Sequence, residues 1–336
     1  MDAQSEKIIY SKSANLRLPM ASTTKIMTAI LAIESEIPLD RVIFVPKEAT
    51  YVEGSSLYLE YGEEITLEAL LYGLLLCSAN DASIVIATAV CGSVEGFVDK
   101  MNEKARQIGL SDTSFKNPHG LFDDGHYTSA KDLALLMSYC IKNEMFLRIS
   151  GTQKRVFPRG DDKTRVMINH NRLLNTDERV ISGKTGYTKK SGRCLVSVAQ
   201  KDGMTLICVT LNAPDDWNDH KKLYNFGFSS YKRINTGALD ISVPVISGRN
   251  KSILARAEGV SILLPSAQND VQMRICLPRF VFSPIKKGDH LGYVLYLLDG
   301  KVIARAEIYA LDDSPAISYK FNLFEWLREL FIKLRN

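Results

Sequence analysis

The stretch that decides the fold is residues 18–28, Leu-Pro-Met-Ala-Ser-Thr-Thr-Lys-Ile-Met-Thr, in which Ser22 stands three residues before Lys25. Apolar residues continue at helical spacing to Glu34, so we expect a helix that begins near Ser22. Residues three apart share a helix face, which lets the Lys25 amine reach the Ser22 hydroxyl. A helix start also favours an alkoxide and a nearby oxyanion. A serine needs a base to become a nucleophile, and a lysine in an apolar pocket can be that base.

The Ser-x-x-Lys spacing alone does not single out Ser22, because it recurs at Ser229/Lys232 and Ser283/Lys286. Two further motifs add the context that those two copies lack. Ser78-Ala-Asn80 interrupts the otherwise apolar segment 67–90, and Lys184-Thr185-Gly186 occurs once, in a run with the character of a strand. Taken singly, Ser22 can be a helix cap, residues 78–80 a loop and residues 184–186 a surface turn. In this order and setting, the three predict a serine acyl-transfer enzyme.

Each motif has a task in such an enzyme. Lys184 would be a second cation that lowers the pKa of Lys25 and attracts a substrate carboxylate. Ser78 can pass protons between the lysines and a leaving amine. Asn80 offers an amide that holds either a substrate carbonyl or the Lys25 amine.

The rest of the pattern predicts an α+β fold of helices packed on an antiparallel sheet. Residues 67–90 are long enough to cross a membrane, but Asn80 and Asp81 would lie near the bilayer centre at high cost. We therefore expect two buried helices joined by a polar turn. Residues 128–139 read as a capped helix, 180–188 as a strand, and 194–211 as a hairpin that turns at Asp202-Gly203. Helices followed by antiparallel strands are typical of α+β domains.

We expect three parts: a catalytic domain over residues 1–228, a small all-β domain over 229–318, and an amphipathic helix over 319–336. Residues 1–10 read as the end of a strand, a turn and a second strand. The N-terminal sequence lacks the charged segment followed by an apolar segment that marks a secretory signal. A chain that begins inside a hairpin suggests a truncated N-terminus. In the tail, Leu323, Phe324 and Leu327 lie on one helical face, which favours an interfacial membrane anchor over a helix packed on protein.

Composition excludes little beyond nucleic acid. The net charge is only +4 and no run of basic residues occurs, so there is no electrostatic footprint for a nucleic-acid partner. The six cysteines form no Cys-x-x-Cys motif and mostly lie in apolar stretches, which favours buried small hydrophobic residues and leaves their pairing open. We predict no metal and no cofactor.

Together the motifs resemble those of the penicillin-binding and serine β-lactamase superfamily. More narrowly, the chain resembles the low-molecular-mass D-alanyl-D-alanine carboxypeptidases of peptidase family S11, in which the amphipathic tail is a peripheral membrane anchor. The matching stretches are residues 18–28, 78–82, 115–121, 126–130 and 183–188. The resemblance implies a bacterial enzyme at the extracytoplasmic face of the cell membrane. It would act on peptidoglycan stem peptides and be acylated by β-lactams.

The resemblance also assigns the site. It implies the catalytic residues Ser22, Lys25 and Ser78, and the substrate-binding residues Asn80, Lys184, Thr185, Gly186 and Tyr187. The backbone N–H groups of Ser22 and Tyr187 would form the oxyanion hole. Residues 211–216 depart from the pattern, because some relatives place a carboxylate-binding arginine there and this chain has none.

Two alternatives remain open at the level of sequence. A β-lactamase is disfavoured because the Glu-x-x-Leu-Asn segment of class A enzymes is absent and Ser-Ala-Asn replaces Ser-Asp-Asn. An inactive wall-binding scaffold of the same fold is disfavoured because Ser22, Lys25, Ser78 and Lys184 are all intact.

Overall fold

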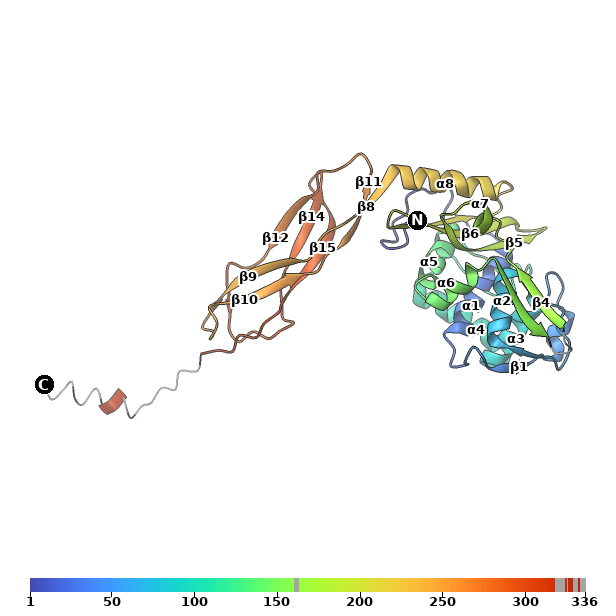
Figure 1. Cartoon of the computed structure of the whole chain (residues 1–336), viewed down its shortest axis with the longest axis horizontal. Helices are drawn as coiled ribbons and strands as arrows, with labels where there is room; N and C mark the ends of the chain where they lie inside the picture. The colour runs from blue at the N-terminus through green and yellow to red at the C-terminus, as the bar shows by residue number, and fades with distance from the viewer. Residues whose placement is uncertain (160–162, 318–323, 325, 329–331, 333–336) are drawn as a thin grey trace. The chain divides into compact units, whose positions relative to one another are not determined.

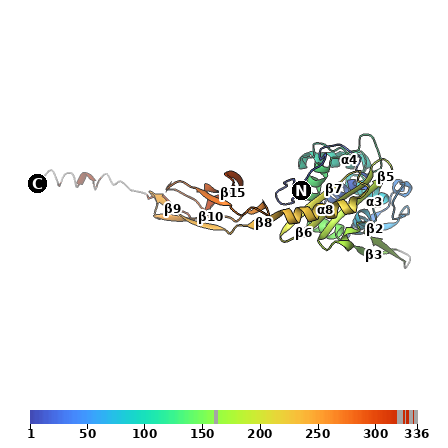
Figure 2. The ribbon, with the colours of Figure 1, turned by 90° about the horizontal axis from the view of Figure 1, so that it is seen from above.

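The computed structural model describes residues 1–159, 163–317, 324, 326–328 and 332. The chain divides into two compact units, Met1–Lys232 and Arg233–Asn336, and each is described by itself (Figures 1 and 2). The fold is α+β, as predicted. The domain boundary expected after residue 228 falls inside helix α8 (Asp216–Ser230).

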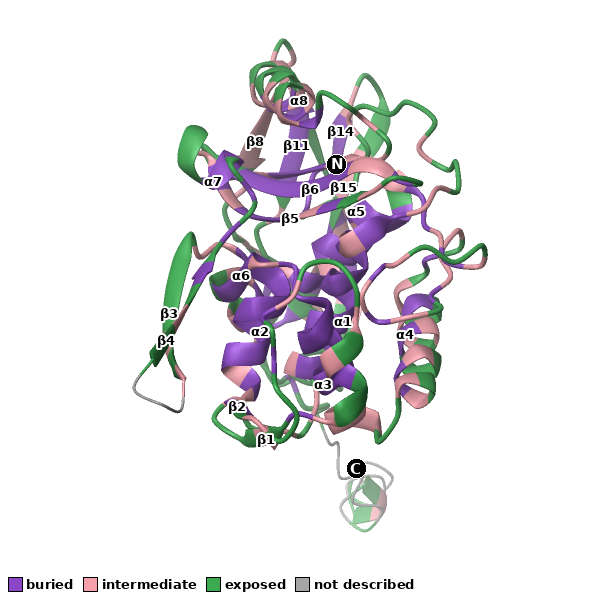
Figure 3. Ribbon diagram, turned by 90° about the vertical axis from the view of Figure 1, so that its right-hand side faces the viewer, coloured by how far each residue is buried: buried purple, intermediate pink, exposed green. Residues whose placement is uncertain are grey.

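More residues of the first unit are in helices than in strands. Helix α1 (Lys25–Ile33) is buried on almost every side at the centre of the helical layer (Figure 3). It follows η1 (Ala21–Thr24) and contacts α2 (Leu67–Leu76), α3 (Asn80–Cys91), α4 (Val94–Ile108), α5 (Ala130–Cys140) and α6 (Glu144–Ser150). Of the remaining short helices, η2 (Lys47–Tyr51) packs on α3 and α7 (Leu173–Thr176) packs on strand β5 (Val180–Thr188). Side-chain oxygens cap several helix starts. Ser129 Oγ, for example, accepts the Asp132 N–H at 3.1 Å and starts the helix predicted near residue 128.

A three-stranded antiparallel sheet lies against the helices, in the order β5 (Val180–Thr188), β6 (Gly192–Lys201) and β7 (Met204–Thr210). Its side chains alternate between two cores. Val196, Val198 and Ile207 face the helical core, whereas Leu195 and Leu206 pack towards α8 on the other face. Two short ribbons, β1 (Val42–Phe44) with β2 (Glu64–Thr66) and β3 (Lys154–Arg159) with β4 (Lys163–Ile168), complete the unit.

The N-terminal hairpin expected over residues 1–10 does not form. Asp2 bridges Leu206 on β7, but residues 4–10 contain no strand. The Asp2 carboxylate accepts both the N–H and the hydroxyl of Ser5, and Asp2 N–H donates to the Lys7 carbonyl, which closes a turn. Ile9 then packs in the cluster beside α8. Of the apolar run expected as a second strand, Ile9 is thus used for packing, whereas Ile8 and Tyr10 are exposed.

Segment 67–90 forms two buried helices joined by a polar turn, as predicted. Within the described ranges, no one helix is both long enough and apolar enough to cross a membrane. Helices α3 and α4 reach that standard only as a pair, across a bend of 85°.

Residues 233–317 of the second unit form β-strands and no helix, as predicted for the small domain. Its main sheet has the order β12 (Gln272–Cys276), β14 (His290–Leu298), β15 (Lys301–Ala310), β10 (Ser252–Ala257), β9 (Leu239–Ile246) and β13 (Val281–Phe282). Strands β8 (Tyr231–Asn235) and β11 (Ser261–Pro265) form a separate ribbon. Most of the helix predicted over 319–336 lies outside the described residues.

The cysteines are free. Cys140, Cys194 and Cys208 are buried, as the apolar context predicted, whereas Cys77, Cys91 and Cys276 are partly exposed. Among the residues that the structure describes, no cluster of histidine, cysteine and acidic side chains could hold a metal ion.

Candidate active site

Ser22 lies on the 3-10 turn that leads into α1, directly after Ala21, whose φ is +47°. A left-handed conformation is costly for alanine, so neighbouring groups have to hold it. Thr24 Oγ1 donates to the Ala21 carbonyl at 2.8 Å and contacts His126 Nε2 at 2.7 Å. His126 Nδ1 accepts the Lys116 N–H at 3.0 Å, so the ring proton is on Nε2 and faces Thr24. This chain of hydrogen bonds fixes the peptide before Ser22.

The Lys25 amine is fully buried and contacts three oxygen atoms. It lies 2.9 Å from Ser22 Oγ, 2.6 Å from Asn80 Oδ1 and 2.6 Å from the His119 carbonyl oxygen. Burial, and secondly the charge of Lys184, holds the pKa of Lys25 well below its usual range. A neutral amine has two N–H groups and one lone pair. Because Asn80 Oδ1 and the His119 carbonyl can only accept, the lone pair is left for the Ser22 hydroxyl proton.

Ser78 contacts the second buried lysine, Lys184. Its backbone is left-handed, with φ at +60°, in the turn between α2 and α3. Lys184 Nζ on β5 donates to Ser78 Oγ at 2.9 Å and to the Thr185 carbonyl at 2.9 Å. Burial lowers the pKa of Lys184 to about 7. The site therefore holds two buried lysines whose pKa values are both lowered, and the Ser78 hydroxyl contacts one of them, Lys184.

Gly186 brings strand β5 against the nucleophile. A Cβ at this position would lie 3.0 Å from Ser22 N and 3.1 Å from the Met20 carbonyl oxygen, too close for an undisturbed side chain. The next residue, Tyr187, is exposed, and Thr185 is half-buried. The turn of Ser22 and the strand of Lys184 thus meet at the glycine of the Lys-Thr-Gly motif. The structure brings the predicted site residues together from η1, α1, the α2–α3 turn, the start of α3 and β5.

Asp81 is a site residue that the sequence reasoning missed. It is buried, and its carboxylate accepts hydrogen bonds from Ser56 Oγ at 2.6 Å and from the N–H groups of Leu57 and Leu59 at 3.1 Å each. Asn80 Nδ2 donates to the Glu53 carbonyl at 2.6 Å, which turns Asn80 Oδ1 towards Lys25. The Asn-Asp pair therefore holds segment 53–59 over the site. The signal available in the sequence was an acidic residue inside an apolar run.

The loop 117–121 closes the site from the other side. Thr28 Oγ1 donates to the Pro118 carbonyl at 2.6 Å, next to the His119 carbonyl that accepts from Lys25. Gly120 has φ +95°, and a Cβ there would lie 2.0 Å from the Ala21 carbonyl oxygen. The sequence contained this loop only as a matching stretch without a role.

An arginine does lie beside the Lys-Thr-Gly strand, although none occurs in residues 211–216. Arg193 on β6 is the register partner of Tyr187. Its guanidinium donates to Asp216 Oδ1 at 2.7 Å and lies over the Trp217 ring at 5.4 Å. This cation is thus fixed at the start of α8 by an ion pair.

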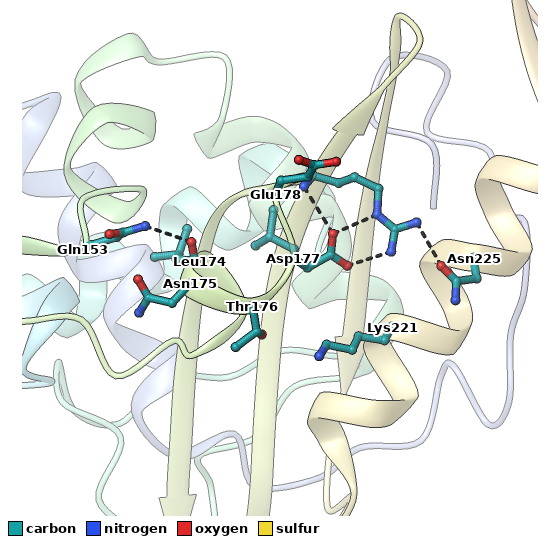
Figure 4. A pocket seen from close by; sticks show the side chains of 10 residues that line it. Gln153, Leu174, Asn175, Thr176, Asp177, Glu178, Lys221 and Asn225 are labelled. Carbon is teal, nitrogen blue, oxygen red and sulfur yellow. Dashed lines mark hydrogen bonds and ion pairs between the residues drawn. The ribbon is translucent and has the colours of Figure 1, made fainter.

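A hollow of about 930 Å³ lies elsewhere, between α7, the start of β5 and α8 (Figure 4). Two of its charged groups pair with each other, since Arg179 binds the Asp177 carboxylate at 2.7 Å, and Arg179 also donates to Asn225 Oδ1 at 2.9 Å. None of Ser22, Lys25, Ser78 and Lys184 lines it. The candidate active site is therefore the cluster of Ser22, Lys25, Ser78 and Lys184, whose side chains contact each other in pairs, and not this hollow.

Residues 1–215 match the model of peptidase family S11, described as D-alanyl-D-alanine carboxypeptidase. The chain belongs to this family. It is 38% identical over 323 residues to the D-alanyl-D-alanine carboxypeptidase DacF of Bacillus subtilis, a match that covers 91% of this chain and 82% of that protein. Identity to DacC of Escherichia coli is 31%, covering 93% of this chain and 82% of the relative.

Solved structures agree with this membership. Penicillin binding protein 5 from Haemophilus influenzae superposes with a TM-score of 0.81 at 28% identity, covering 94% of this chain and 96% of that one. A peptidoglycan synthesis regulatory factor, PBP3 of Streptococcus pneumoniae, shares the fold with a TM-score of 0.78 at 23% identity, covering 93% and 97% of the two chains. The family's fold therefore extends over both units.

Proposed function

We propose that the protein is a serine-type D-alanyl-D-alanine carboxypeptidase that removes the terminal D-alanine from peptidoglycan stem peptides through an acyl-enzyme on Ser22. The contact of 2.9 Å between Lys25 Nζ and Ser22 Oγ carries the proposal, because it pairs a hydroxyl with a buried amine whose pKa is lowered. Family membership supplies the reaction class. No observation favours the β-lactamase or the inactive scaffold.

In the first half-reaction, Lys25 takes the Ser22 proton as Oγ attacks the carbonyl carbon between the two D-alanines. The oxyanion of the tetrahedral intermediate accepts from the backbone N–H groups of Ser22 and Tyr187, and each such donor contributes about 10²–10³ in rate. Ser78 donates its proton to the leaving amine and regains one from Lys25. The C–N bond breaks and D-alanine leaves.

In the second half-reaction, water attacks the ester and gives its proton to Lys25. The ester C–O bond then breaks, and Ser22 recovers its proton. Lys184, in its ammonium form, and the Thr185 hydroxyl would bind the terminal carboxylate of the substrate. Asn80 would keep Lys25 oriented throughout, because its side-chain oxygen lies 2.6 Å from the amine.

Penicillin labelling tests the nucleophile. We expect one covalent penicillin per chain by intact-protein mass, and no adduct for Ser22→Ala. Ser229→Ala and Ser283→Ala are matched controls, because these serines share the Ser-x-x-Lys spacing, and both should label normally. A folded wild-type protein of unchanged mass after excess penicillin would contradict the acyl-enzyme. Release of D-alanine from a peptide ending in D-Ala-D-Ala then checks the reaction.

We also propose a location at the extracytoplasmic face of the bacterial membrane, with the tail as a peripheral anchor. The amphipathic pattern of residues 321–336 supports it, as does the exposure of Phe324 (85%) and Ile332 (55%) among the described tail residues. Deleting residues 321–336 should release the protein from membranes and leave penicillin acylation unchanged. Unchanged membrane binding after the deletion would argue against the anchor.

A further inference from the structure

Exposed apolar side chains gather at one end of the main sheet of the second unit, where strand β9 stops. Ile246 ends β9 and is the register partner of Phe282 on β13, and these side chains are 40% and 66% exposed. Phe280 packs edge-to-face on Phe282, with ring centroids 5.5 Å apart. The backbone of Ile317, whose side chain is 42% exposed, lies next to the end of β9, because its N–H donates to the carbonyl of Ser247 at 2.9 Å. We call Ile246, Phe280, Phe282 and Ile317 the Phe282 surface.

The fold of this unit does not explain the Phe282 surface. The core is built from inward-facing side chains such as Val243, Ile253 and Ile308, which are nearly fully buried. Phe280 and Phe282 face outwards, and their contact with each other leaves both rings at least 44% exposed. Single exposed apolar residues are common on protein surfaces, whereas neighbouring ones with two aromatic rings indicate a binding surface.

Basic side chains belong to the same end of the sheet. They are Arg249 and Lys251 in the β9–β10 turn, Arg279 beside Phe280, and Lys286 and Lys287 before β14. All five are exposed, and none forms an ion pair with a described residue.

The acidic side chains near this surface accept hydrogen bonds from the backbone of its loops. Asp289, Asp312 and Asp313 accept backbone N–H groups from Lys286, Leu254 and Lys287 respectively. The surface is therefore apolar in part and surrounded by more positive than negative charge.

The last continuous described stretch of the chain ends at this surface. Ala316 bridges Gly248 in the β9–β10 turn, and the Arg249 N–H donates to the Pro315 carbonyl at 3.1 Å. Residues 318–336 therefore begin beside Ile317. Their sequence carries Trp326 and an apolar helical face, together with Lys320, Arg328 and Lys333. The last described residue before the tail, Ile317, thus belongs to the Phe282 surface.

We propose that the Phe282 surface docks on an anionic lipid bilayer as a second membrane contact beside the tail. The rings of Phe280 and Phe282 enter the interface, and the five basic side chains contact phosphate headgroups. In interfacial binding, buried apolar area and electrostatic attraction to anionic lipid both strengthen the affinity for the membrane. The proposal rests on the proposed extracytoplasmic location and does not depend on catalysis.

Vesicle binding by the full chain tests the proposal. The probe is a vesicle of phosphatidylcholine with phosphatidylglycerol, compared with phosphatidylcholine alone. The double variant Phe280→Ser/Phe282→Ser should bind the anionic vesicles about tenfold more weakly than wild type. The matched control is Met273→Ser/Val302→Ser. These side chains are 53% and 56% exposed and lie at the opposite end of the sheet, in register with Tyr296 and Leu297. The control should bind as wild type.

A charge variant tests the second contribution. Arg249→Gln/Lys251→Gln should weaken binding to the anionic vesicles severalfold, with little change on phosphatidylcholine alone, whereas Lys301→Gln at the β14–β15 turn should change neither. Equal binding by the phenylalanine variant and wild type overturns the proposal, as does equal loss in the Met273/Val302 control. A wild-type dimer that the phenylalanine variant abolishes, with vesicle binding unchanged, would assign the surface to a second copy instead.

Penicillin acylation separates this test from the proposed activity. Every variant should acylate normally, because none touches the Ser22 site. Suppose that wild type is not acylated, but binds anionic vesicles, and that the phenylalanine variant loses this binding. That result would contradict the proposed enzyme and still support membrane docking by the Phe282 surface.

Discussion

At the scale of single residues, the proposed contact between the Lys184 ammonium and the substrate carboxylate predicts a dependence of substrate binding on pH. Its amine is buried and donates to Ser78 Oγ, and burial lowers its pKa to about 7. In the free enzyme the ammonium form is therefore present below pH 7 and is lost above it. Only the ammonium form attracts a carboxylate, so kcat/KM for a peptide ending in D-Ala-D-Ala should fall by up to tenfold per pH unit above about 7.

The matched substrate is the same peptide ending in D-alaninamide, which carries no terminal charge. At pH 6, kcat/KM for this amide should be lower than kcat/KM for the peptide with a free carboxylate. Between pH 7 and 9, kcat/KM for the amide should decline less than it does for that peptide. Parallel alkaline declines for the two substrates would remove Lys184 from carboxylate recognition, while leaving its contact with Ser78 in place.

At the scale of elements, the first turn of α3 positions a whole segment through Asp81. Asp81→Asn keeps the size of the side chain but places a donor where Ser56, Leu57 and Leu59 now donate. One buried donor is then left without an acceptor, at a cost of about 1–3 kcal/mol. Segment 53–59 should loosen, and acylation should slow about tenfold as Asn80 loses the Glu53 carbonyl.

Hydrogen exchange of the Leu57 and Leu59 amides checks this prediction directly, alongside the acylation rate. Asp99→Asn, an exposed acid on α4, is the control and should change neither readout. Slower acylation with fully protected amides would show that Asp81 acts through its charge and not by holding the segment.

The same elements show how far the sequence could predict the fold and the site. Ser22, Lys25, Ser78 and Lys184 were identifiable because residue type and local spacing carry their chemistry. His126 lay in a stretch that resembles the family, but its contact with Thr24 could not be predicted. The two residues are 102 positions apart in the sequence, and only the packing of the fold brings them together. The strand expected near Ile9 was wrong because apolar periodicity cannot distinguish pairing along β7 from packing beside α8.

At the scale of the whole first unit, buried histidines couple folding to pH. Burial lowers the pKa of His220 to about 3 and that of His126 to about 4, from the usual 6.5. His220 lies among Ser197, Thr210 and Tyr224, with Ser197 Oγ 2.6 Å from its Nδ1 and 2.6 Å from the Tyr224 hydroxyl. The unfolded chain binds protons at these rings below pH 6.5 and the folded chain does not. Stability is therefore full above pH 6.5 and falls with pH towards 4.

Each of the two rings should contribute about 2 kcal/mol of lost stability at pH 5. The midpoint of thermal unfolding of this unit, followed by calorimetry, should thus fall steeply between pH 6.5 and 5. His220→Gln removes one titrating ring, so the variant should be less stable at pH 7.5 but show a flatter dependence on pH. His290→Gln, at an exposed position on β14, should leave the dependence unchanged. An equally steep dependence in His220→Gln and wild type would mean that other groups, and not this buried ring, bind the protons on acid unfolding.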